Sequence, residues 1–261
     1  WPARREAFCD CRESRERAEW CLAMLSDHAW NGASDENRIV NAKLRREWSE
    51  ELLHRAAELT EAGWKAVGIQ DDEPRISIFN PLSFPRREPI EVDLPQGARP
   101  AWPRGLAAQA LDDGRGRRLC FLPPEVPGFG IREIALVPAP EDAPAGSAEV
   151  PFRIGERSLE GPFWTLRWDE AAGGIRGAVH RPTGRDIVVP GARDALCGTR
   201  YHDGREHVLE RVTCRVVDVG PLLARLRMQG EVAGIRVVTF ATLYAAIDRL
   251  DLEARIEKPV D

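Results

Sequence analysis

The sequence predicts a multidomain α+β protein in which an N-terminal helical segment precedes antiparallel β-sandwich regions. Apolar residues recur every three or four positions up to about residue 68, and alternate with polar ones from Ile76 onward. Turns rich in glycine and proline separate the alternating runs, and no helical pattern lies between them, which disfavours a parallel sheet. We expect three domains, over residues 1–70, 75–138 and 150–261.

The first expected helix has an apolar face followed by a stop signal. Its apolar positions follow the helical period: Ala18, Cys21, Leu22 and Leu25. Asn31-Gly32 then ends the pattern, because glycine readily adopts the left-handed conformation that closes a helix. We expect this helix to pack its apolar face against the next one.

The second expected helix begins near Ser34 and Asp35, either of which can cap its first turn. Its apolar positions are Leu44, Trp48, Leu52, Ala56 and Leu59. Gly63, Gly68 and Pro74 are expected to end it, since glycine and proline are poor helix formers.

The second domain is expected to consist of short strands. Apolar residues alternate at Ile76 and Ile78 and again over 90–94, and apolar runs follow over 119–122 and 131–137. Asn-Pro and other proline-containing turns separate them. The composition of residues 138–149, P-A-P-E-D-A-P-A-G-S-A-E, is typical of a linker or an exposed crossing.

The third domain is predicted to contain longer antiparallel strands with one face in water. Trp164, Leu166 and Trp168 share one face, which places Trp164 in a core rather than on a sugar-binding surface. Two hairpin turns follow, Gly173-Gly174 and Pro182-Thr183-Gly184. Residues 250–256 alternate in the same way near the end of the chain.

Composition limits the class of partner. A net charge of −5 without a long Lys/Arg cluster predicts no nucleic-acid partner, and no apolar stretch approaches 18 residues, which predicts no membrane span.

The six cysteines lack metal-finger spacing, and we interpret them as free thiols of a cytoplasmic, bacterial protein. Because the first residue is Trp1, we interpret the chain as a piece of a longer protein, so a missing signal peptide is uninformative.

Four residues of Y-H-D-G-R-E-H carry groups that bind metals: His202, Asp203, Glu206 and His207. Gly204 interrupts them, and a polar turn between two strands is the commoner explanation.

The remaining titratable candidates are assigned structural positions. His54 lies on the polar face of a helix and His180 lies beside a turn, so both are expected to be solvated surface groups. Asp169-Glu170 is interpreted as the lead into the Gly173-Gly174 turn. A catalytic pair of carboxylates cannot be located by spacing, because its members can come from distant loops.

A series of stretches then adds a resemblance. They are I-S-I-F-N-P-L-S-F-P-R-R (76–87), C-F-L-P-P-E-V-P-G-F-G-I-R-E-I (120–134), the segment 159–188 with its G-G-I and T-G-R turns, G-P-L-L-A-R-L-R (220–227) and L-Y-A-A-I-D-R-L-D-L-E-A-R-I (243–256). In this order they resemble the β part of glycoside hydrolase family 38, the α-mannosidase family. Two departures are Phe84, where the family usually has tryptophan, and the change around Arg181, where an aspartate is expected.

The resemblance implies that this chain is the helical middle domain and the start of the C-terminal β domain of such an enzyme. The family cleaves α-mannosides or related oligosaccharides with retention, through a covalent glycosyl-enzyme, with a divalent metal that is usually zinc. Its N-terminal domain carries the aspartate nucleophile, the acid/base and most metal ligands, all of which would lie upstream of Trp1. We therefore expect no catalytic residue in this chain, and no activity from it alone.

One metal ligand is nevertheless expected here. S-D-H-A-W-N-G (26–32) resembles the family element often written D-E-H-T-W-G, in which a helical domain donates a histidine near the end of a helix. His28 matches the ligand, Trp30 the aromatic and Gly32 the glycine, with Asn31 as an extra residue. Zinc binds neutral imidazole readily, and the partial negative charge of a helix C-terminus favours a cation. Asp27 is a candidate to orient His28.

The residues themselves leave other interpretations open. One alternative is a stand-alone carbohydrate-binding or interaction module built on β-sandwiches, using an exposed aromatic such as Trp102 or Trp164. Another is a different sugar-cleaving family that shares the large β domain. The linkage cleaved and the oligomeric state are not predicted.

Overall fold

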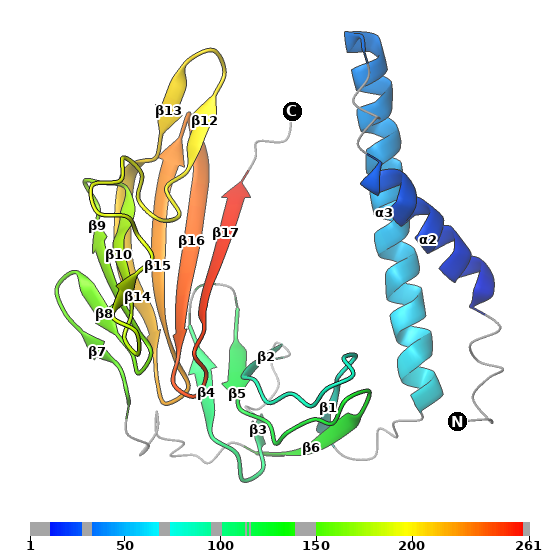
Figure 1. The fold of residues 1–261 in the computed structure, drawn as a ribbon. Helices are drawn as coiled ribbons and strands as arrows, with labels where there is room; N and C mark the ends of the chain where they lie inside the picture. The colour runs from blue at the N-terminus through cyan, green and yellow to red at the C-terminus, as the bar shows by residue number, and fades with distance from the viewer. Residues whose placement is uncertain are drawn as a thin grey trace. The chain divides into compact units, whose positions relative to one another are not determined.

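The chain forms two compact units, Trp1–Glu73 and Pro74–Asp261, shown in the computed structural model in Figure 1. The structure describes residues 11–27, 33–67, 74–94, 101–112, 114, 116–138 and 150–257. Helices occupy the first unit and antiparallel strands the second, which confirms the predicted fold class. The finer division into domains over 1–70, 75–138 and 150–261 stays a prediction.

The first unit is a hairpin of two antiparallel helices, α2 (Arg12–Ser26) and α3 (Asp35–Val67). Ser34 caps α3 as predicted, because its Oγ accepts a hydrogen bond from the backbone N–H of Asn37 at 3.3 Å. The prediction that Gly63 helps to end this helix is wrong, since α3 continues to Val67. A glycine inside a helix costs only about 1 kcal/mol relative to alanine, which a long helix tolerates.

The contact between the helices combines a small core with an ion pair. Cys21 and Trp48 are buried, and Trp48 packs edge-on against Trp20 with ring centroids 5.5 Å apart. Arg17 holds both carboxylate oxygens of Glu51, at 2.8 and 2.7 Å. Leu22 departs from the predicted apolar face, because it is 55% exposed. Packing against α3 covers a narrower strip of α2 than the helical period indicates.

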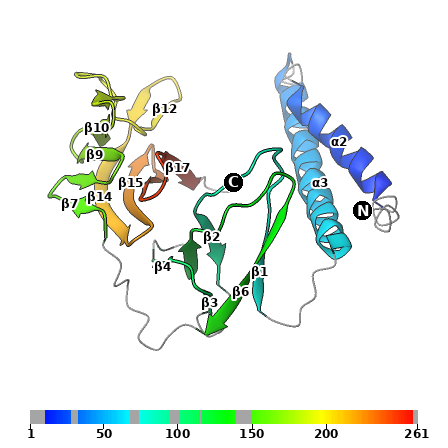
Figure 2. The ribbon, with the colours of Figure 1, turned by 60° about the horizontal axis from the view of Figure 1, so that its bottom comes forward.

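The second unit begins with two three-stranded antiparallel sheets, which lie side by side in Figure 2. The order of the first sheet is β1-β6-β3, and that of the second is β2-β5-β4. Their strands are β1 (Arg75–Phe79), β2 (Ile90–Asp93), β3 (Ala101–Pro103), β4 (Ala108–Leu111), β5 (Arg118–Phe121) and β6 (Ile131–Pro138). The predicted strands over this region are therefore present, and β3 and β4 are additional.

The rest of the second unit is dominated by two larger antiparallel sheets and a short hairpin. One sheet has the order β11-β10-β9-β8-β7, the other has the order β14-β15-β16-β17, and β12 pairs with β13. The strands are β7 (Arg153–Ile154), β8 (Ser158–Glu160), β9 (Trp164–Asp169), β10 (Gly174–His180), β11 (Arg185–Asp186), β12 (Arg200–His202), β13 (Glu206–Val208), β14 (Glu210–Val219), β15 (Leu223–Val232), β16 (Ile235–Tyr244) and β17 (Leu250–Glu257).

The two larger sheets share one hydrophobic core. Leu166, Trp168 and Ile175 of the five-stranded sheet are buried with Leu226 and Leu243 of the four-stranded sheet, among others. Trp164 packs against this core, as the alternating pattern predicted. The edge strand β17 lies largely outside it, because its apolar residues 252 and 256 stay 42% and 57% exposed. This sandwich is the largest buried core of the part of the chain that the structure describes.

The other face of the four-stranded sheet is covered at one end by the β2-β5-β4 sheet. A second buried cluster joins Leu111 and Cys120 of the small sheet to Leu222, Leu223 and Tyr244. One side of the large sheet thus faces the sandwich core, and the other side holds this smaller interface.

Across the described ranges, neither helix combines the length and the apolar character needed to cross a membrane. The cysteines at 11, 21, 120, 197 and 214 are free thiols, as predicted, and Cys9 lies outside the described residues. A cytoplasmic location stays a prediction.

Burial gives a testable difference among these thiols. Burial raises the pKa of Cys120 to about 12, so almost none of it is the nucleophilic thiolate at pH 8. We expect iodoacetamide at pH 8 to label the half-buried Cys11 in the folded chain and to spare Cys120. Peptide mass spectrometry before and after addition of urea measures this. Equal labelling of both thiols in the folded chain would contradict the buried position of Cys120.

Candidate functional site

The candidate metal ligand His28 lies outside the described residues, together with Trp30 and Gly32. The residue before it is described. Asp27 follows the last residue of α2 and has an extended backbone, with φ −70° and ψ 120°. The chain therefore leaves the helix one residue before His28.

The C-terminus of α2 is bound by an arginine of the neighbouring helix. Arg45 donates hydrogen bonds to the carbonyl oxygens of Leu25 at 2.8 Å and Asp27 at 3.2 Å. These contacts fix the backbone at residue 27 against α3. They also place a guanidinium on the carbonyls, so the partial negative charge of the helix end is already compensated. The helix-end argument for a cation at this place is therefore weaker than the sequence indicated.

In the described ranges no group of three or more His, Cys, Asp or Glu side chains is arranged to hold a metal. The four residues of the 202–207 motif instead lie on and around the β12–β13 hairpin, as predicted. His207 contacts Asp203 at 3.0 Å, while Glu206 pairs with Arg193 and Arg200. These pairs cross-link a polar hairpin.

Two predictions about histidines have opposite outcomes. His54 is 69% exposed and pairs with Glu58 one turn away, which confirms a surface position. The prediction that His180 is a solvated surface group is wrong, because its side chain is 19% exposed. Its Nε2 lies 2.7 Å from Asp248 and its Nδ1 lies 2.8 Å from the Thr183 hydroxyl. The turn between β16 and β17 supplies Asp248, so tertiary folding makes this contact.

Trp164 belongs to the same cluster. Its indole N–H donates to the Asp248 carboxylate at 3.0 Å, and its ring centroid lies 4.9 Å from that of His180. The core therefore covers part of this side chain, and its polar group is already bonded. A free stacking surface for a sugar ring would need the opposite arrangement.

Asp169 and Glu170 lead into the turn that follows them, as predicted, and the Glu170 side chain also reaches β14. Asp169 accepts a hydrogen bond from the backbone N–H of Ala171 at 3.0 Å, and Glu170 accepts one from Cys214 at 2.7 Å. Gly173 has φ +81°, a conformation that favours glycine. Both carboxylates are thus occupied in positioning backbone.

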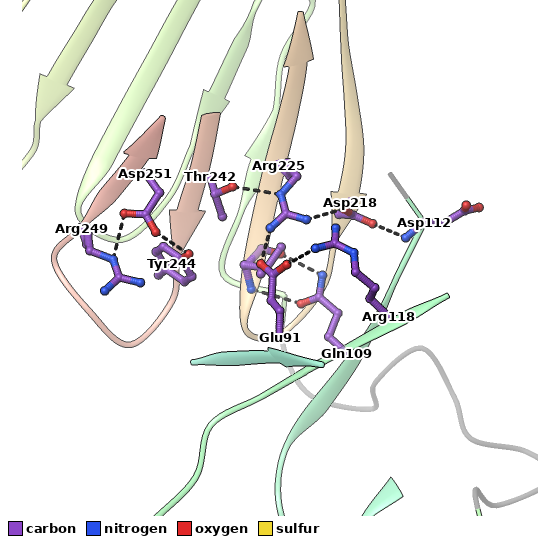
Figure 3. Close-up of polar contacts among 11 residues, drawn as sticks. Glu91, Gln109, Asp112, Arg118, Asp218, Arg225, Thr242, Tyr244, Arg249 and Asp251 are labelled. Atoms are coloured by element: carbon purple, nitrogen blue, oxygen red, sulfur yellow. Dashed lines mark hydrogen bonds and ion pairs between the residues drawn. The ribbon is translucent and has the colours of Figure 1, made fainter. Parts of the chain in front are cut away.

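A buried cluster of polar side chains lies where the β2-β5-β4 sheet meets the four-stranded sheet (Figure 3). At its centre is Arg225, which is 3% exposed. It pairs with Glu91 of the small sheet and with Asp218 of the neighbouring strand, and donates to the Thr242 hydroxyl at 2.9 Å. Arg118 also pairs with Glu91. Hydrogen bonds and opposite charges thus compensate these buried ions, as a low-dielectric environment requires.

Gln109 makes a second polar connection across the same interface. Its side-chain oxygen accepts hydrogen bonds from the backbone N–H groups of Leu222 and Leu223, both at 3.1 Å. Its amide nitrogen donates to the carbonyl of Leu223 at 3.1 Å. The Gln109 side chain thus makes hydrogen bonds with the backbone of the turn before β15, as a neighbouring strand would. Figure 3 shows it beside Glu91 and Arg118.

A third polar group lies at the other side of this interface. The Tyr244 hydroxyl donates to Asp251 at 2.7 Å, and Arg249 lies over the Tyr244 ring and pairs with Glu88 at 2.7 Å. Burial raises the pKa of the Tyr244 hydroxyl, and the hydrogen bonds from Arg86 lower the pKa of Glu88. Neither group is set up as a proton donor or acceptor for a reaction near neutral pH.

The sequence did not reveal this interface as a unit. Its residues come from seven strands and the turns between them, and some contacts join positions more than 100 residues apart. Their arrangement holds two sheets together and leaves no paired, open carboxylates for hydrolysis among the residues described. One feature of the sequence could have indicated this interface. Charged residues such as Arg225 occur inside otherwise apolar strands, and a charged residue there needs a buried partner.

Comparison with solved structures finds a similar fold, whereas the sequence comparisons find no match. No family model matches the sequence, and no curated protein matches it. The fold is similar to the crystal structure of a protein in the glycosyl hydrolase family 38 from Enterococcus faecalis, with a TM-score of 0.54 and 10% sequence identity. The match covers 86% of this chain and 36% of that one, so this chain spans about a third of the length of its structural relative. The family-38-like fold expected from the sequence motifs is confirmed.

Proposed function

We propose that this chain is part of a metal-dependent, retaining, α-mannosidase-like glycoside hydrolase. The observation that carries the proposal is the structural similarity to a family 38 protein over 86% of this chain. The order of the sequence motifs over residues 76–256 supports the same family independently of the coordinates. The substrate is then an α-mannoside or a related oligosaccharide.

In this proposal the chain supplies support and one metal ligand. The nucleophile and the acid/base belong to a part of the enzyme that these residues do not include. His28 is proposed as a ligand of a divalent metal, with zinc as the first candidate, since imidazole suits zinc. When bound, such a metal orients sugar hydroxyls and stabilises developing charge. The other ligands would come from outside the described residues, which bring together no ligand set of their own.

The described residues support this proposed ligand by fixing the position of the residue before it, Asp27. Arg45 binds the last carbonyls of α2, so the backbone leading to His28 is attached to both helices of the hairpin. A ligand held by such a support loses less conformational entropy on metal binding than one on a free loop. Because Asp27 directly precedes His28, it remains the candidate to orient the imidazole.

The first test is hydrolysis of an aryl α-mannoside by the complete protein. We expect cleavage that depends on added zinc or cobalt and is lost with a chelator, and NMR should show an α-configured first product, as retention requires. An aryl β-mannoside is the matched control and should not be cleaved. A complete protein that binds zinc but cleaves no α-mannoside would contradict the proposed activity.

The second test concerns His28 and is separate from activity. In the complete protein, His28→Ala should lower the bound zinc, measured by atomic emission, by about tenfold or more at limiting metal, because one of few ligands is lost. His54→Ala is the control, since His54 is an exposed histidine of the same helical unit. An unchanged zinc content in His28→Ala would exclude His28 as a ligand, whatever the activity.

A further inference from the structure

Two arginines face each other on the open part of the four-stranded sheet. Arg215 of β14 and Arg227 of β15 are direct register partners, so their Cβ atoms lie about 5 Å apart. Their side chains project away from the sandwich core, because the alternate residues Cys214, Val216, Leu226 and Met228 belong to that core. Like charges in this relation destabilise a sheet unless an opposite charge joins them.

Two buried carboxylates near this part of the sheet, Asp218 and Glu91, already form ion pairs with other arginines. Asp218, on the same face of β14, pairs with Arg225 and accepts the backbone N–H of Asp112 at 2.7 Å. Glu91 is shared between Arg225 and Arg118. Asp218 and Glu91 thus pair with Arg225 and Arg118, and no ion pair with a described carboxylate involves Arg215 or Arg227.

The next acidic residue along the register does not compensate them. Glu253 of β17 pairs in register with Phe240 of β16, and Phe240 pairs with Arg227, so two strand spacings of about 5 Å each separate the glutamate from the arginine. Within the described residues, neither Arg215 nor Arg227 forms a hydrogen bond or an ion pair.

The Arg227 side chain also has a buried hydrogen-bond donor that lacks an acceptor among the described atoms. Its Nε atom is shielded from solvent and has no hydrogen-bond partner among the described atoms. Its Nη1 atom reaches the turn between β4 and β5, because a Cβ placed on Gly114 would lie 3.9 Å from it. A buried donor of this kind calls for an ion or a water as its acceptor. Arg215, by contrast, is exposed, so the pair is open to solvent on one side.

We propose that Arg215 and Arg227 form a binding site for an oxyanion, a sulfate, phosphate or carboxylate group that lies between the two guanidinium groups. Guanidinium groups bind such oxygens through paired, charge-assisted hydrogen bonds, and an anion here neutralises the uncompensated charges. Thr213 and Gln229, which form the next register pair on the same face, place a hydroxyl and an amide beside the site. The ligand is either a free inorganic anion or the acidic group of a glycan.

Isothermal titration of the 261-residue chain at constant ionic strength tests this site. The probes are inorganic sulfate, inorganic phosphate and glucuronate, with mannose as the neutral probe. We expect one-to-one binding of at least one anion and none of mannose. Tighter binding of sulfate or phosphate indicates a free tetrahedral ion, and tighter binding of glucuronate indicates an acidic sugar. Failure of all three anions to bind would overturn the proposal.

Variants separate the site from general charge effects. Arg215→Gln and Arg227→Gln should each weaken anion binding by about tenfold or more, because each removes a charged donor. Arg255→Gln removes the same charge from an exposed side chain of β17, on the same face, and should bind as the unmodified chain does. Equal weakening in all three variants would show non-specific attraction and overturn the site. Arg215 is exposed, so its variant tests the site even where Arg227→Gln fails to fold. This outcome does not depend on the proposed glycosidase activity.

Discussion

Replacing Arg225 by methionine is expected to lower the free energy of unfolding by about 3–5 kcal/mol, because it leaves the buried carboxylate of Asp218 without its counter-charge and Glu91 with Arg118 alone. Arg225 joins Glu91 of the β2-β5-β4 sheet to Asp218 of the four-stranded sheet, and only 3% of its side chain is exposed. Methionine keeps most of the side-chain volume, so the loss reports on charge rather than on a cavity.

Urea denaturation at pH 7, followed by tryptophan fluorescence, measures this loss. Arg236→Met is the matched control, since Arg236 lies on the next strand, is 48% exposed and pairs with Glu257 at 3.4 Å. An exposed pair contributes little, so the control should change stability by less than about 1 kcal/mol. Equal losses in the two variants would show that the buried network does not stabilise the interface.

Replacing Gln109 by leucine is expected to cost about 2–5 kcal/mol. The substitution removes three hydrogen bonds to the backbone of Leu222 and Leu223, and each buried group left without a partner costs about 1–3 kcal/mol. The position is also closely packed, because a Cβ added to Gly220 would lie 2.4 Å from the Gln109 side chain. Leucine therefore cannot shift towards this turn to recover the loss.

The control for this prediction is Gln229→Leu. Gln229 lies on β15, is partly exposed and has no hydrogen-bond partner for its side chain among the residues described. It should change the midpoint of urea unfolding only slightly, since surface substitutions usually stay within about 0.5 kcal/mol. If Gln109→Leu is as mild as the control, the amide does not hold the two sheets together.

Both predictions concern the same structural question. The composition of residues 138–149 predicts a linker between two domains, yet the sheets on either side of it share a hydrophobic cluster and a buried ion network. We expect residues 74–138 and 150–257 to unfold in one transition when that interface is intact. In Arg225→Met, separation into two transitions would identify the network as the coupling element.

Local patterns in the sequence predicted most of the elements. The change from a helical to an alternating period places the boundary between helices and strands, and Ser34 begins its helix as a capping residue should. The alternation of Trp164, Leu166 and Trp168 assigned these residues to the core, because adjacent residues of a strand point to opposite faces. These features depend on neighbours in the chain, so the sequence contains them directly.

Where packing decided the outcome, the sequence was wrong or silent. Leu22 follows the helical period but stays 55% exposed, and Gly63 lies inside α3, which continues to Val67. His180 carries no signal that Asp248, 68 residues away, will bind it. Arg45 at the end of α2 changes the electrostatics beside His28, and its position 20 residues after Leu25 gave no indication of that.

The sequence by itself determined the fold class, the order of the elements and the family whose motifs the chain resembles, because local periodicity and turn residues encode them. It also proposed His28 as a metal ligand, and that hypothesis depends on a resemblance that the described residues leave untested. Only the tertiary structure brought Glu91 to Arg225 and Arg215 beside Arg227. Strand register decides such contacts, and register follows from the packing of whole sheets rather than from the residues next to each position.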